Sequence, residues 1–233
     1  MIDLRRRDGR LLRVGHRGAA ALAPENTTRS LALAVELGCD LVEFDVVELD
    51  GGLVLAHSPA ELPEEPASLD EALAFLAPTG RGIHVDLKTP GTEPAIAGAL
   101  RRHGVVERSL VSSFRPASLR ALRGLEPQLA LGLTYPQDRH GLSTRRILSG
   151  LVRPALAVMR TALAARIGWM LSSTQATAAV LHLSVVSPAV VRRCQTLGVP
   201  VLAWTALTAD EVRRLDRLGV DGVIADDPRI VPG

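Results

Sequence analysis

The sequence predicts an α/β protein, a single (β/α)8 TIM barrel whose domain takes in residues 1–233. Three observations lead to this fold class. Short β-rich apolar runs alternate with longer Ala-, Leu- and Arg-rich segments of helical period, a pattern that indicates repeated βα units and a parallel sheet. The chain length of 233 residues suits one such barrel. A hydrophobic fraction of 47% beside 22% charged residues allows a sizeable core.

Eight apolar runs have the length and composition of strands, and eight parallel strands with intervening helices close most naturally into a barrel. The expected strands are Arg13–His16, Leu41–Val47, Ile83–Leu87, Leu110–Ser113, Ala130–Leu133, Val180–Leu183, Val201–Trp204 and Gly222–Ile224. A short extra strand, Leu53–Ala56, is expected after the turn at Asp50-Gly51-Gly52.

The helices between these strands carry recognisable boundary signals. Expected helices are Thr27–Leu37 after Asn26, Leu69–Leu76 after Ser68, Ala189–Leu197 after Ser187-Pro188, and Ala209–Leu218 after Thr208. Asn26 is interpreted as a helix N-cap rather than a ligand, and Glu71 completes a capping box with Ser68. A helix longer than one βα unit needs is expected between Arg145 and Gln175.

Charge and cysteine content exclude several classes of protein. The 27 basic and 25 acidic residues leave a net charge of +2, so nucleic acid is not an expected partner. Cys39 and Cys194 are isolated in apolar helical stretches and are interpreted as core residues. The N-terminus lacks the apolar run of a secretory signal, and no apolar window is long enough to span a membrane, which together predict a cytoplasmic protein.

Polar residues interrupt the apolar pattern at the first strands, where His16-Arg17-Gly18, Pro24-Glu25-Asn26-Thr27, Glu43-x-Asp45 and His57 occur in order. Two imidazoles can trade a proton near neutral pH. Two carboxylates at alternate positions of a strand point the same way and can share a cation. The guanidinium of an arginine suits an oxyanion such as phosphate. Since the C-terminal strand ends form the active face of a barrel, these residues are expected to converge there.

The third main strand adds His84, Asp86 and Lys88 at alternate positions. With Glu43 and Asp45, Asp86 would complete an all-oxygen site, which favours one divalent cation, Mg²⁺ or Ca²⁺, over Zn²⁺. Lys88 would lie beside these carboxylates, either to orient one of them or to hold a phosphate oxygen. Packing of its stem in the barrel, with a purely structural partner for the amine, is the competing interpretation.

These motifs together resemble the glycerophosphodiester phosphodiesterase family, whose domain is a (β/α) barrel. The matching segments also include Asp50-Gly51, Ala203-Trp204-Thr205 and the run from Gly219 to Pro228, so the resemblance spans nearly the whole chain. It implies a metal-dependent phosphodiester hydrolase that cleaves glycerophosphodiesters to an alcohol and glycerol phosphate.

The resemblance also assigns roles to residues of this chain. It implies that His16 and His57 are the acid/base pair, that Arg17 contacts the phosphate, and that Glu43 and Asp45 are metal ligands. Two departures from the family pattern concern this site. Asp86 stands where the family usually has glutamate, and Ser58 follows His57 where the family typically has aspartate, so an orienting carboxylate is expected to be missing there.

The segment between His57 and Ser68 is short, where the family commonly carries an insertion, which implies an open site able to take a bulkier diester. A lysophospholipase-D-like hydrolase acting on a lysolipid, and a barrel that binds phosphate or metal without turnover, are therefore the alternative functions. Trp204 would wall the pocket against an apolar part of the substrate, or simply pack in the core. Residues 148–171 are rich in Leu, Val, Met and Trp, and are interpreted either as a peripheral membrane contact or as an ordinary outer helix of the barrel.

Overall fold

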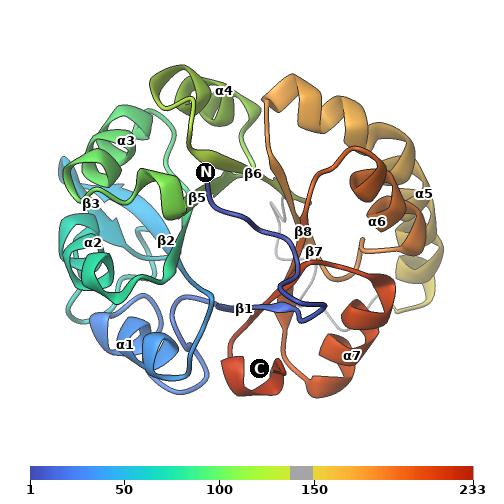
Figure 1. Ribbon diagram of the computed structural model, residues 1–233, viewed down its shortest axis with the longest axis horizontal. Helices are drawn as coiled ribbons and strands as arrows, with labels where there is room; N and C mark the ends of the chain where they lie inside the picture. The colour runs from blue at the N-terminus through green and yellow to red at the C-terminus, as the bar shows by residue number, and fades with distance from the viewer. Residues whose placement is uncertain (137–148, 233) are drawn as a thin grey trace.

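The computed structural model describes residues 1–136 and 149–232, leaving aside the side chains of 149–158. The strands are β1 (Leu12–Gly15), β2 (Leu41–Leu49), β3 (Gly52–Leu55), β4 (Gly82–Leu87), β5 (Ser109–Ser113), β6 (Ala130–Tyr135), β7 (Ala178–His182), β8 (Val201–Ala206) and β9 (Gly222–Ala225). Eight of them run parallel in the order β1-β9-β8-β7-β6-β5-β4-β2, and pairing of β1 with β2 closes the ring (Figure 1). The short β3 is antiparallel to β2. The predicted barrel is confirmed, and the strand ends differ from the expected ones by no more than two residues.

Helices surround the barrel on its outside (Figure 1). The described part of the chain contains α1 (Thr28–Glu36), α2 (Leu69–Leu76), α3 (Glu93–Arg102), α4 (Pro116–Leu125), α5 (Ser149–Thr174), α6 (Pro188–Thr196) and α7 (Ala209–Leu218). Ser68, Ser187 and Thr208 cap the starts of α2, α6 and α7, as the sequence predicts, and Ser68 and Thr208 do so in capping boxes. The interpretation of Asn26 as a cap is wrong, because the N-cap of α1 is Thr27, whose hydroxyl accepts a hydrogen bond from the Ser30 backbone N–H.

Side chains inside the barrel form a small apolar layer that ends where the polar residues begin. Alternate residues of a strand point to opposite faces. On β2, Val42, Phe44 and Val46 therefore pack outward against the helices, while Leu41 packs inward with Leu12 of β1 and their neighbours. The next inward positions of β2 are the acidic ones, so the apolar layer supports a polar site nearer the C-terminal strand ends.

The N-terminal segment crosses the opposite mouth of the barrel (Figure 1). Leu4, which is buried, and the partly buried Ile2 pack against the inner apolar layer there. This segment closes the face away from the acidic positions.

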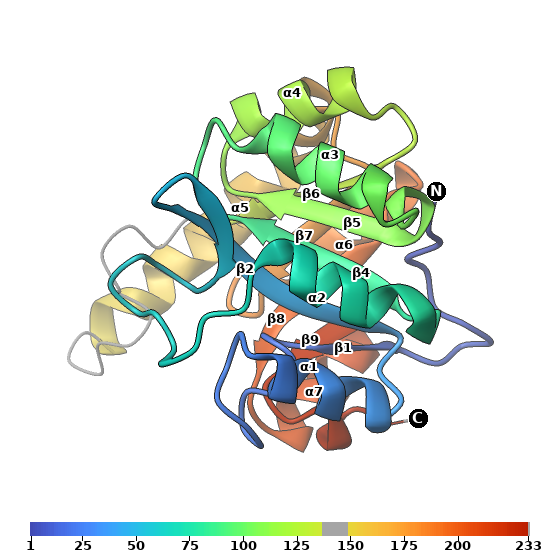
Figure 2. The same ribbon diagram turned by 90° about the vertical axis from the view of Figure 1, so that its left-hand side faces the viewer.

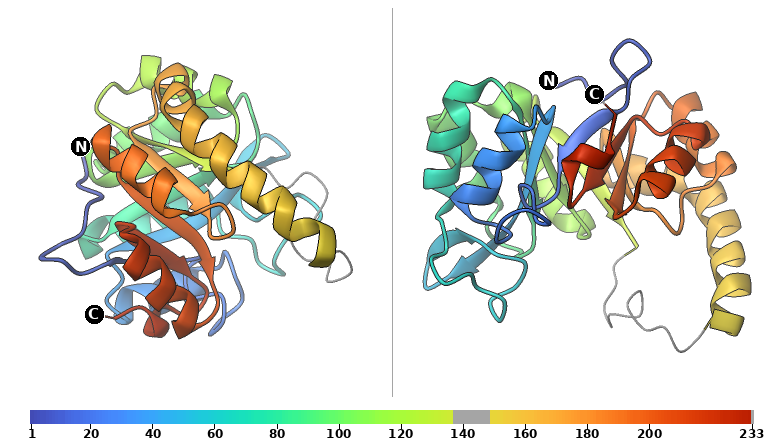
Figure 3. Two further views of the ribbon diagram at one scale, coloured as in Figure 1. Left: turned by 90° about the vertical axis from the view of Figure 1, so that its right-hand side faces the viewer. Right: turned by 90° about the horizontal axis from the view of Figure 1, so that it is seen from below.

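Helix α5 is 26 residues long and confirms the expectation of an extended helix in this region. Its first turns stand clear of the barrel, on the side away from both chain termini (Figures 2 and 3). Its second half packs on the barrel through the buried side chains of Leu163, Ile167 and Leu171. That half is therefore an outer barrel helix, one of the two interpretations of the segment; residue 148 lies outside the described residues. None of the described helices is long and apolar enough to cross a membrane.

Candidate active site

His16 follows β1 directly, and its imidazole is held by a carboxylate from the neighbouring strand. The His16 Nδ1 atom lies 2.5 Å from Asp226 Oδ1, and Asp226 directly follows β9. Burial lowers the pKa of His16, but the hydrogen bond with Asp226 and the charge of Glu43 outweigh it and leave the pKa above its ordinary value. Sequence analysis missed the role of Asp226, although closure of the barrel places the ends of its first and last strands side by side.

The loop after His16 brings Arg17 over the acidic residues. Its backbone N–H donates to Glu43 Oε2 at 2.7 Å, while its guanidinium lies 2.6 Å from Glu25 Oε1 and 2.9 Å from Asp45 Oδ2. Gly18 makes this path possible, since it has a φ of +82° and a Cβ there would lie 2.4 Å from the Ser30 backbone carbon. Arg17 is thus a fixed positive charge beside the carboxylates.

Glu43 and Asp45 both point into the barrel from β2, and Asp86 on β4 is the register partner of Asp45. Burial and the charge of Asp45 raise the pKa of Glu43 to about 7. Burial alone would raise the pKa of Asp45 too, but Lys88 and Arg17 hold it well below its usual range. The three carboxylates therefore lie on the neighbouring strands β2 and β4 and line the same cavity.

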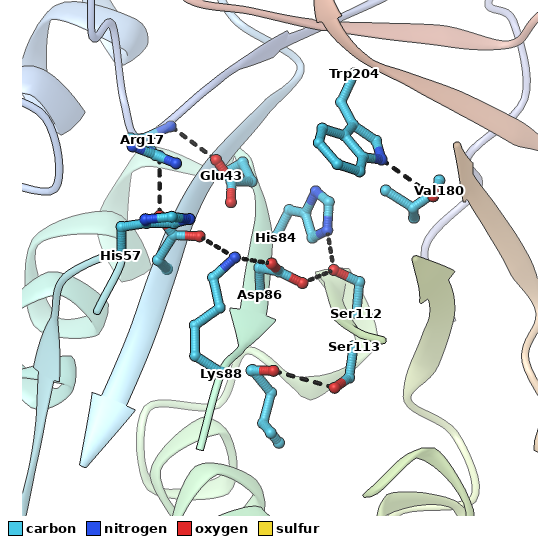
Figure 4. Close-up of polar contacts among 12 residues, drawn as sticks. Arg17, Glu43, His57, His84, Asp86, Lys88, Ser112, Ser113, Val180 and Trp204 are labelled. Carbon is cyan, nitrogen blue, oxygen red and sulfur yellow. Dashed lines mark hydrogen bonds and ion pairs between the residues drawn. The ribbon is translucent and has the colours of Figure 1, made fainter. Parts of the chain in front are cut away.

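Lys88 lies between two of these carboxylates, as Figure 4 shows. Its Nζ atom is 2.8 Å from Asp45 Oδ1 and 2.5 Å from Asp86 Oδ2. Burial lowers the pKa of this amine, but the charges of Asp86 and Asp45 more than offset that and raise it above its usual range. These ion pairs fit both the expected role of orienting a carboxylate and the competing interpretation of a structural partner for the amine, so the role of Lys88 stays a prediction.

Asn26 is a site residue that sequence analysis assigned to a helix cap. Its side chain is buried, donates from Nδ2 to Asp45 Oδ2 at 3.2 Å, and accepts from the Asp45 backbone N–H at 3.0 Å. The backbone φ of +58° turns the side chain toward β2. The signal was its place in the Pro24-Glu25-Asn26-Thr27 motif, one residue before the true cap.

His57 follows β3 and is paired with a carboxylate that the sequence did not lead us to expect. Its Nδ1 atom lies 2.6 Å from Glu61 Oε2, four residues later. Ser58 itself offers no carboxylate, as expected. The conclusion that His57 lacks an orienting carboxylate is nevertheless wrong, because Glu61 in the same loop supplies one. Spacing alone could not reveal this contact, since the loop between the two residues has no regular secondary structure.

A buried hydrogen-bonded chain runs along the wall formed by β4 and β5 (Figure 4). His84 Nε2 lies 2.8 Å from Ser112 Oγ, and the Ser112 hydroxyl donates to Asp86 Oδ1 at 2.6 Å. Burial lowers the pKa of His84 to about 4, so the imidazole is neutral. The sequence placed His84 on the polar strand face without a role and did not single out Ser112.

Aromatic side chains also line the cavity. The Trp204 ring lies edge-on to Phe114, at 6.1 Å between centroids, and to His182, at 4.9 Å. Its indole N–H donates to the Val180 carbonyl at 3.2 Å. The Trp204 ring thus packs against its neighbours and also lines the cavity, while its contact with an apolar part of the substrate stays a prediction.

All the residues that the sequence assigned to the site line one cavity of about 670 Å³. They are His16, Arg17, Glu43, Asp45, His57, Asp86, Lys88 and Trp204. Glu61, His84, Ser112, Phe114, Thr134 and His182 line the same cavity. The arrangement combines four imidazoles with carboxylates that are in direct contact with Arg17 and Lys88.

The donor set suits a hard divalent cation, since three carboxylates converge and the pKa of Glu43 is raised to about 7. In the described residues, however, no group of three or more His, Cys, Asp or Glu side chains is arranged to hold a metal ion as it stands. Lys88 and Arg17 instead occupy positions against Asp45 and Asp86. The chemistry of the site therefore fits the predicted cation, which stays a prediction.

Comparison with known proteins places these residues in context. The chain matches the profile of the glycerophosphoryl diester phosphodiesterase family over residues 16–73 and 83–230. A glycerophosphodiester phosphodiesterase of Caldanaerobacter subterraneus subsp. tengcongensis is 26% identical over an alignment of 254 positions, gaps included, that covers 92% of this chain and 93% of that protein.

Solved structures share the fold. A phosphodiesterase of Oleispira antarctica, in complex with the product sn-glycerol-3-phosphate, matches with a TM-score of 0.71 and 22% identity, covering 94% of each chain. A glycerophosphodiester phosphodiesterase of Parabacteroides distasonis matches with a TM-score of 0.72 and 19% identity, covering 93% of this chain and 92% of the other. At these identities the likeness shows a common barrel.

Proposed function

The chain belongs to the glycerophosphoryl diester phosphodiesterase family, and we propose that it hydrolyses glycerophosphodiesters to an alcohol and glycerol phosphate with one divalent cation, Mg²⁺ or Ca²⁺. The observation that carries the proposal is the position of His16 and His57 on one cavity, each with a carboxylate on Nδ1. Such a contact holds the ring in place and leaves the other nitrogen available for proton transfer.

In this proposal the phosphate lies beside Arg17 and Lys88. Their positive charges stabilise the negative charge that builds on the phosphoryl oxygens in the transition state. One histidine removes a proton from the nucleophile, either water or a neighbouring hydroxyl of the substrate. The other protonates the departing alkoxide.

Glu43, Asp45 and Asp86 are the residues that would hold the cation. When bound, a divalent cation polarises the phosphoryl oxygens. The raised pKa of Glu43, about 7, supports this assignment, since a carboxylate that burial and Asp45 push toward protonation gains most from a nearby positive charge.

A lysophospholipase-D-like activity on a lysolipid is the second candidate. The apolar wall formed by Trp204 and Phe114 favours it, as do the first turns of α5, which stand clear of the barrel (Figure 3). Through those turns the segment 148–171 remains a candidate for peripheral contact with a membrane surface. A non-catalytic barrel is disfavoured, because Glu61 restores the carboxylate partner of His57 that Ser58 lacks.

The test compares three substrates, glycerophosphocholine, lysophosphatidylcholine and a chromogenic aryl phosphodiester, each with Mg²⁺, Ca²⁺ or EDTA. We expect glycerophosphocholine to be hydrolysed with a cation and not with EDTA. Faster hydrolysis of lysophosphatidylcholine would favour the second candidate, and co-sedimentation of the protein with liposomes would separately measure contact with a membrane surface. If no diester is hydrolysed while phosphate still binds, the proposed hydrolase activity is wrong and the chain is a barrel that binds phosphate without turnover.

A further inference from the structure

The charges of the chain are distributed very unevenly along the sequence. Residues 115–209 contain 11 arginines and two acidic residues, Glu126 and Asp138, whereas the rest of the chain contains 16 basic and 23 acidic residues. The small net charge of +2 therefore conceals a strongly basic region. This region includes the helices α4, α5 and α6, which together contain seven arginines and no aspartate or glutamate.

The three helices lie side by side on the outside of the barrel, with α5 between α4 and α6 (Figure 1). Arg123 of α4 donates to the carbonyl oxygen of Gln175, just after α5, at 3.2 Å. On the other side of α5, a Cβ added to Gly168 would lie 3.3 Å from both Arg193 Nη2 and Leu197 Cδ1, so the end of α6 packs there. We call the surface over the ends of these helices the α4–α6 face; it contains Leu125, Arg166, Trp169, Arg192, Arg193 and Leu197.

The arginines of this region lack carboxylate partners. Within the described part of the chain, no arginine of residues 115–209 forms an ion pair, and the exposed side chains of Arg166, Arg192 and Arg193 donate no hydrogen bond either. Arginines elsewhere on the protein do pair with carboxylates, as Arg6, Arg10, Arg101, Arg102, Arg213 and Arg229 show. The α4–α6 face therefore presents positive charge that no neighbouring carboxylate neutralises.

Exposed apolar side chains lie among these charges. Trp169 is 67% exposed, and Leu125 and Leu197 are exposed as well. A helix that connects two parallel strands runs antiparallel to them, so the ends of α4, α5 and α6 lie toward the N-terminal strand ends, away from His16 and His57. Single exposed apolar residues are ordinary, but here one comes from each of three adjacent helix ends, at the same end of the barrel.

This combination of side chains indicates the chemistry of the partner. Guanidinium groups suit phosphate oxygens, and a basic helical surface with exposed aromatic and aliphatic side chains is typical of proteins that lie on an anionic bilayer. The Trp169 ring is apolar with one polar N–H, which favours the headgroup depth of a bilayer. The face is also the outer surface of a ring of helices (Figure 1), and such a convex surface suits a broad partner better than a single strand.

We propose that the α4–α6 face docks the protein on an anionic lipid bilayer, with its arginines on the lipid phosphates and Trp169 among the headgroups. This inference goes beyond the proposed hydrolysis and does not depend on it. It assigns the contact to the second half of α5 with α4 and α6, and not to the first turns of α5. In this orientation the C-terminal mouth of the barrel does not face the bilayer, so dissolved diesters still reach the cavity.

The first test is co-sedimentation with vesicles in EDTA, so that no divalent cation bridges the protein and the lipid phosphates. We expect binding to vesicles of equimolar phosphatidylglycerol and phosphatidylcholine, and at least about tenfold weaker binding to phosphatidylcholine alone. Arg166→Gln combined with Arg192→Gln should weaken binding to the anionic vesicles at least about tenfold, since each arginine near the surface contributes about fivefold. Arg213→Gln with Arg217→Gln, two exposed arginines of α7, is the control of equal charge and should bind like the wild type.

The second test determines the orientation on the bilayer, because Trp169 and Trp204 are the two tryptophans of the chain. Anionic vesicles with brominated acyl chains should quench the fluorescence of the wild-type protein, and Trp169→Phe should remove this quenching. Trp169→Ala should weaken vesicle binding several-fold with an unchanged melting temperature. Leu207→Ala is the matched control, since Leu207 is 63% exposed and lies outside the α4–α6 face, between β8 and α7.

Several results would overturn the proposal. They include equal binding to the two kinds of vesicle, no binding to either, and binding that Arg166→Gln with Arg192→Gln leaves unchanged. Quenching that survives in Trp169→Phe would place Trp204, and with it the cavity, against the bilayer. Tighter binding of a single-stranded oligonucleotide, or self-association that the double variant abolishes, would assign the face to nucleic acid or to a second copy instead.

Hydrolysis of glycerophosphocholine in the presence of the cation separates this proposal from the proposed function. The variants of the α4–α6 face should hydrolyse it at the wild-type rate, because their side chains lie outside the cavity. Vesicle binding without hydrolysis of any diester would contradict the proposed function and support the docking surface. Hydrolysis without vesicle binding would do the reverse.

Discussion

His16 and His57 reach the same local geometry from two very different parts of the molecule. Each has its Nδ1 atom 2.5–2.6 Å from a carboxylate oxygen. The partner of His16 comes from the far end of the sequence, through the pairing of β1 with β9, whereas the partner of His57 lies four residues away in the same loop. The barrel therefore positions one histidine, and a short surface segment positions the other.

The difference in exposure decides how much each carboxylate contributes. The side chains of His16 and Asp226 are 17% and 32% exposed, against 41% and 58% for His57 and Glu61. Water screens an exposed ion pair strongly and competes for its hydrogen bonds. We therefore expect kcat to depend more on Asp226, the partner of His16, than on Glu61, the partner of His57.

The largest effects are expected from removing the imidazoles themselves. His16→Ala and His57→Ala should each lower kcat by at least about 10²-fold, the usual scale for losing a general acid or base. Because the two act in one reaction, the double variant should lose less than the product of the single effects. Steady-state kinetics on glycerophosphocholine measure this, with His103→Ala, outside the cavity, as the control. A His57→Ala variant of near-normal activity would limit the acid/base role to His16.

The next effect tests the less exposed pair, His16 and Asp226. Asp226→Asn keeps the size of the side chain but removes the charge that orients and stabilises the His16 imidazolium, and we expect kcat to fall about 10–100-fold. Asp227→Asn is the matched control, since that neighbouring carboxylate contacts Arg229 instead. Equal losses in the two variants would show that the effect comes from the loop and not from the contact with His16.

The same pair predicts a pH dependence. Although burial lowers it, the pKa of His16 is above its ordinary value because Asp226 and Glu43 favour the imidazolium. The folded protein therefore binds this proton more tightly than the unfolded chain. The resulting stability is complete below about pH 6.5 and is lost as the pH rises through the folded pKa. In Asp226→Asn the pKa should fall, as NMR titration of His16 would show, and this part of the pH dependence of unfolding should disappear. An unchanged pKa would contradict the assigned cause.

The barrel and the residues at its strand ends were predictable because both follow from short-range patterns. Strand alternation alone predicts that Glu43, Asp45, Asp86 and Lys88 share one face, and the contacts of Lys88 with Asp45 and Asp86 confirm it. In contrast, Asp226 becomes visible only once the ring is closed. A sequence pattern gives the face of a strand, but it does not say which loops meet across the mouth of a barrel.

Two errors show the same limit at short range. Asn26 has the composition of a helix cap, but a left-handed backbone turns it toward Asp45 and leaves the cap to Thr27. Ser58 suggested a missing carboxylate, because the family pattern places that carboxylate at the position directly after His57. The physical requirement is a carboxylate within reach of Nδ1, and an irregular loop allows Glu61 to meet it.

The smallest expected effect tests whether Glu61 takes the role of the carboxylate that is missing at position 58. Glu61→Gln should lower kcat only several-fold, since an exposed pair contributes little free energy, with KM and the melting temperature nearly unchanged. Glu64→Gln, an exposed residue of the same loop, is the matched control. If Glu61 acts by orienting His57, Ser58→Asp introduced into the Glu61→Gln variant should recover activity, because it supplies a carboxylate at the position next to His57. A loss in Glu61→Gln as large as that in Asp226→Asn would show that exposure does not separate the two pairs, and no loss at all would show that His57 is oriented by other contacts.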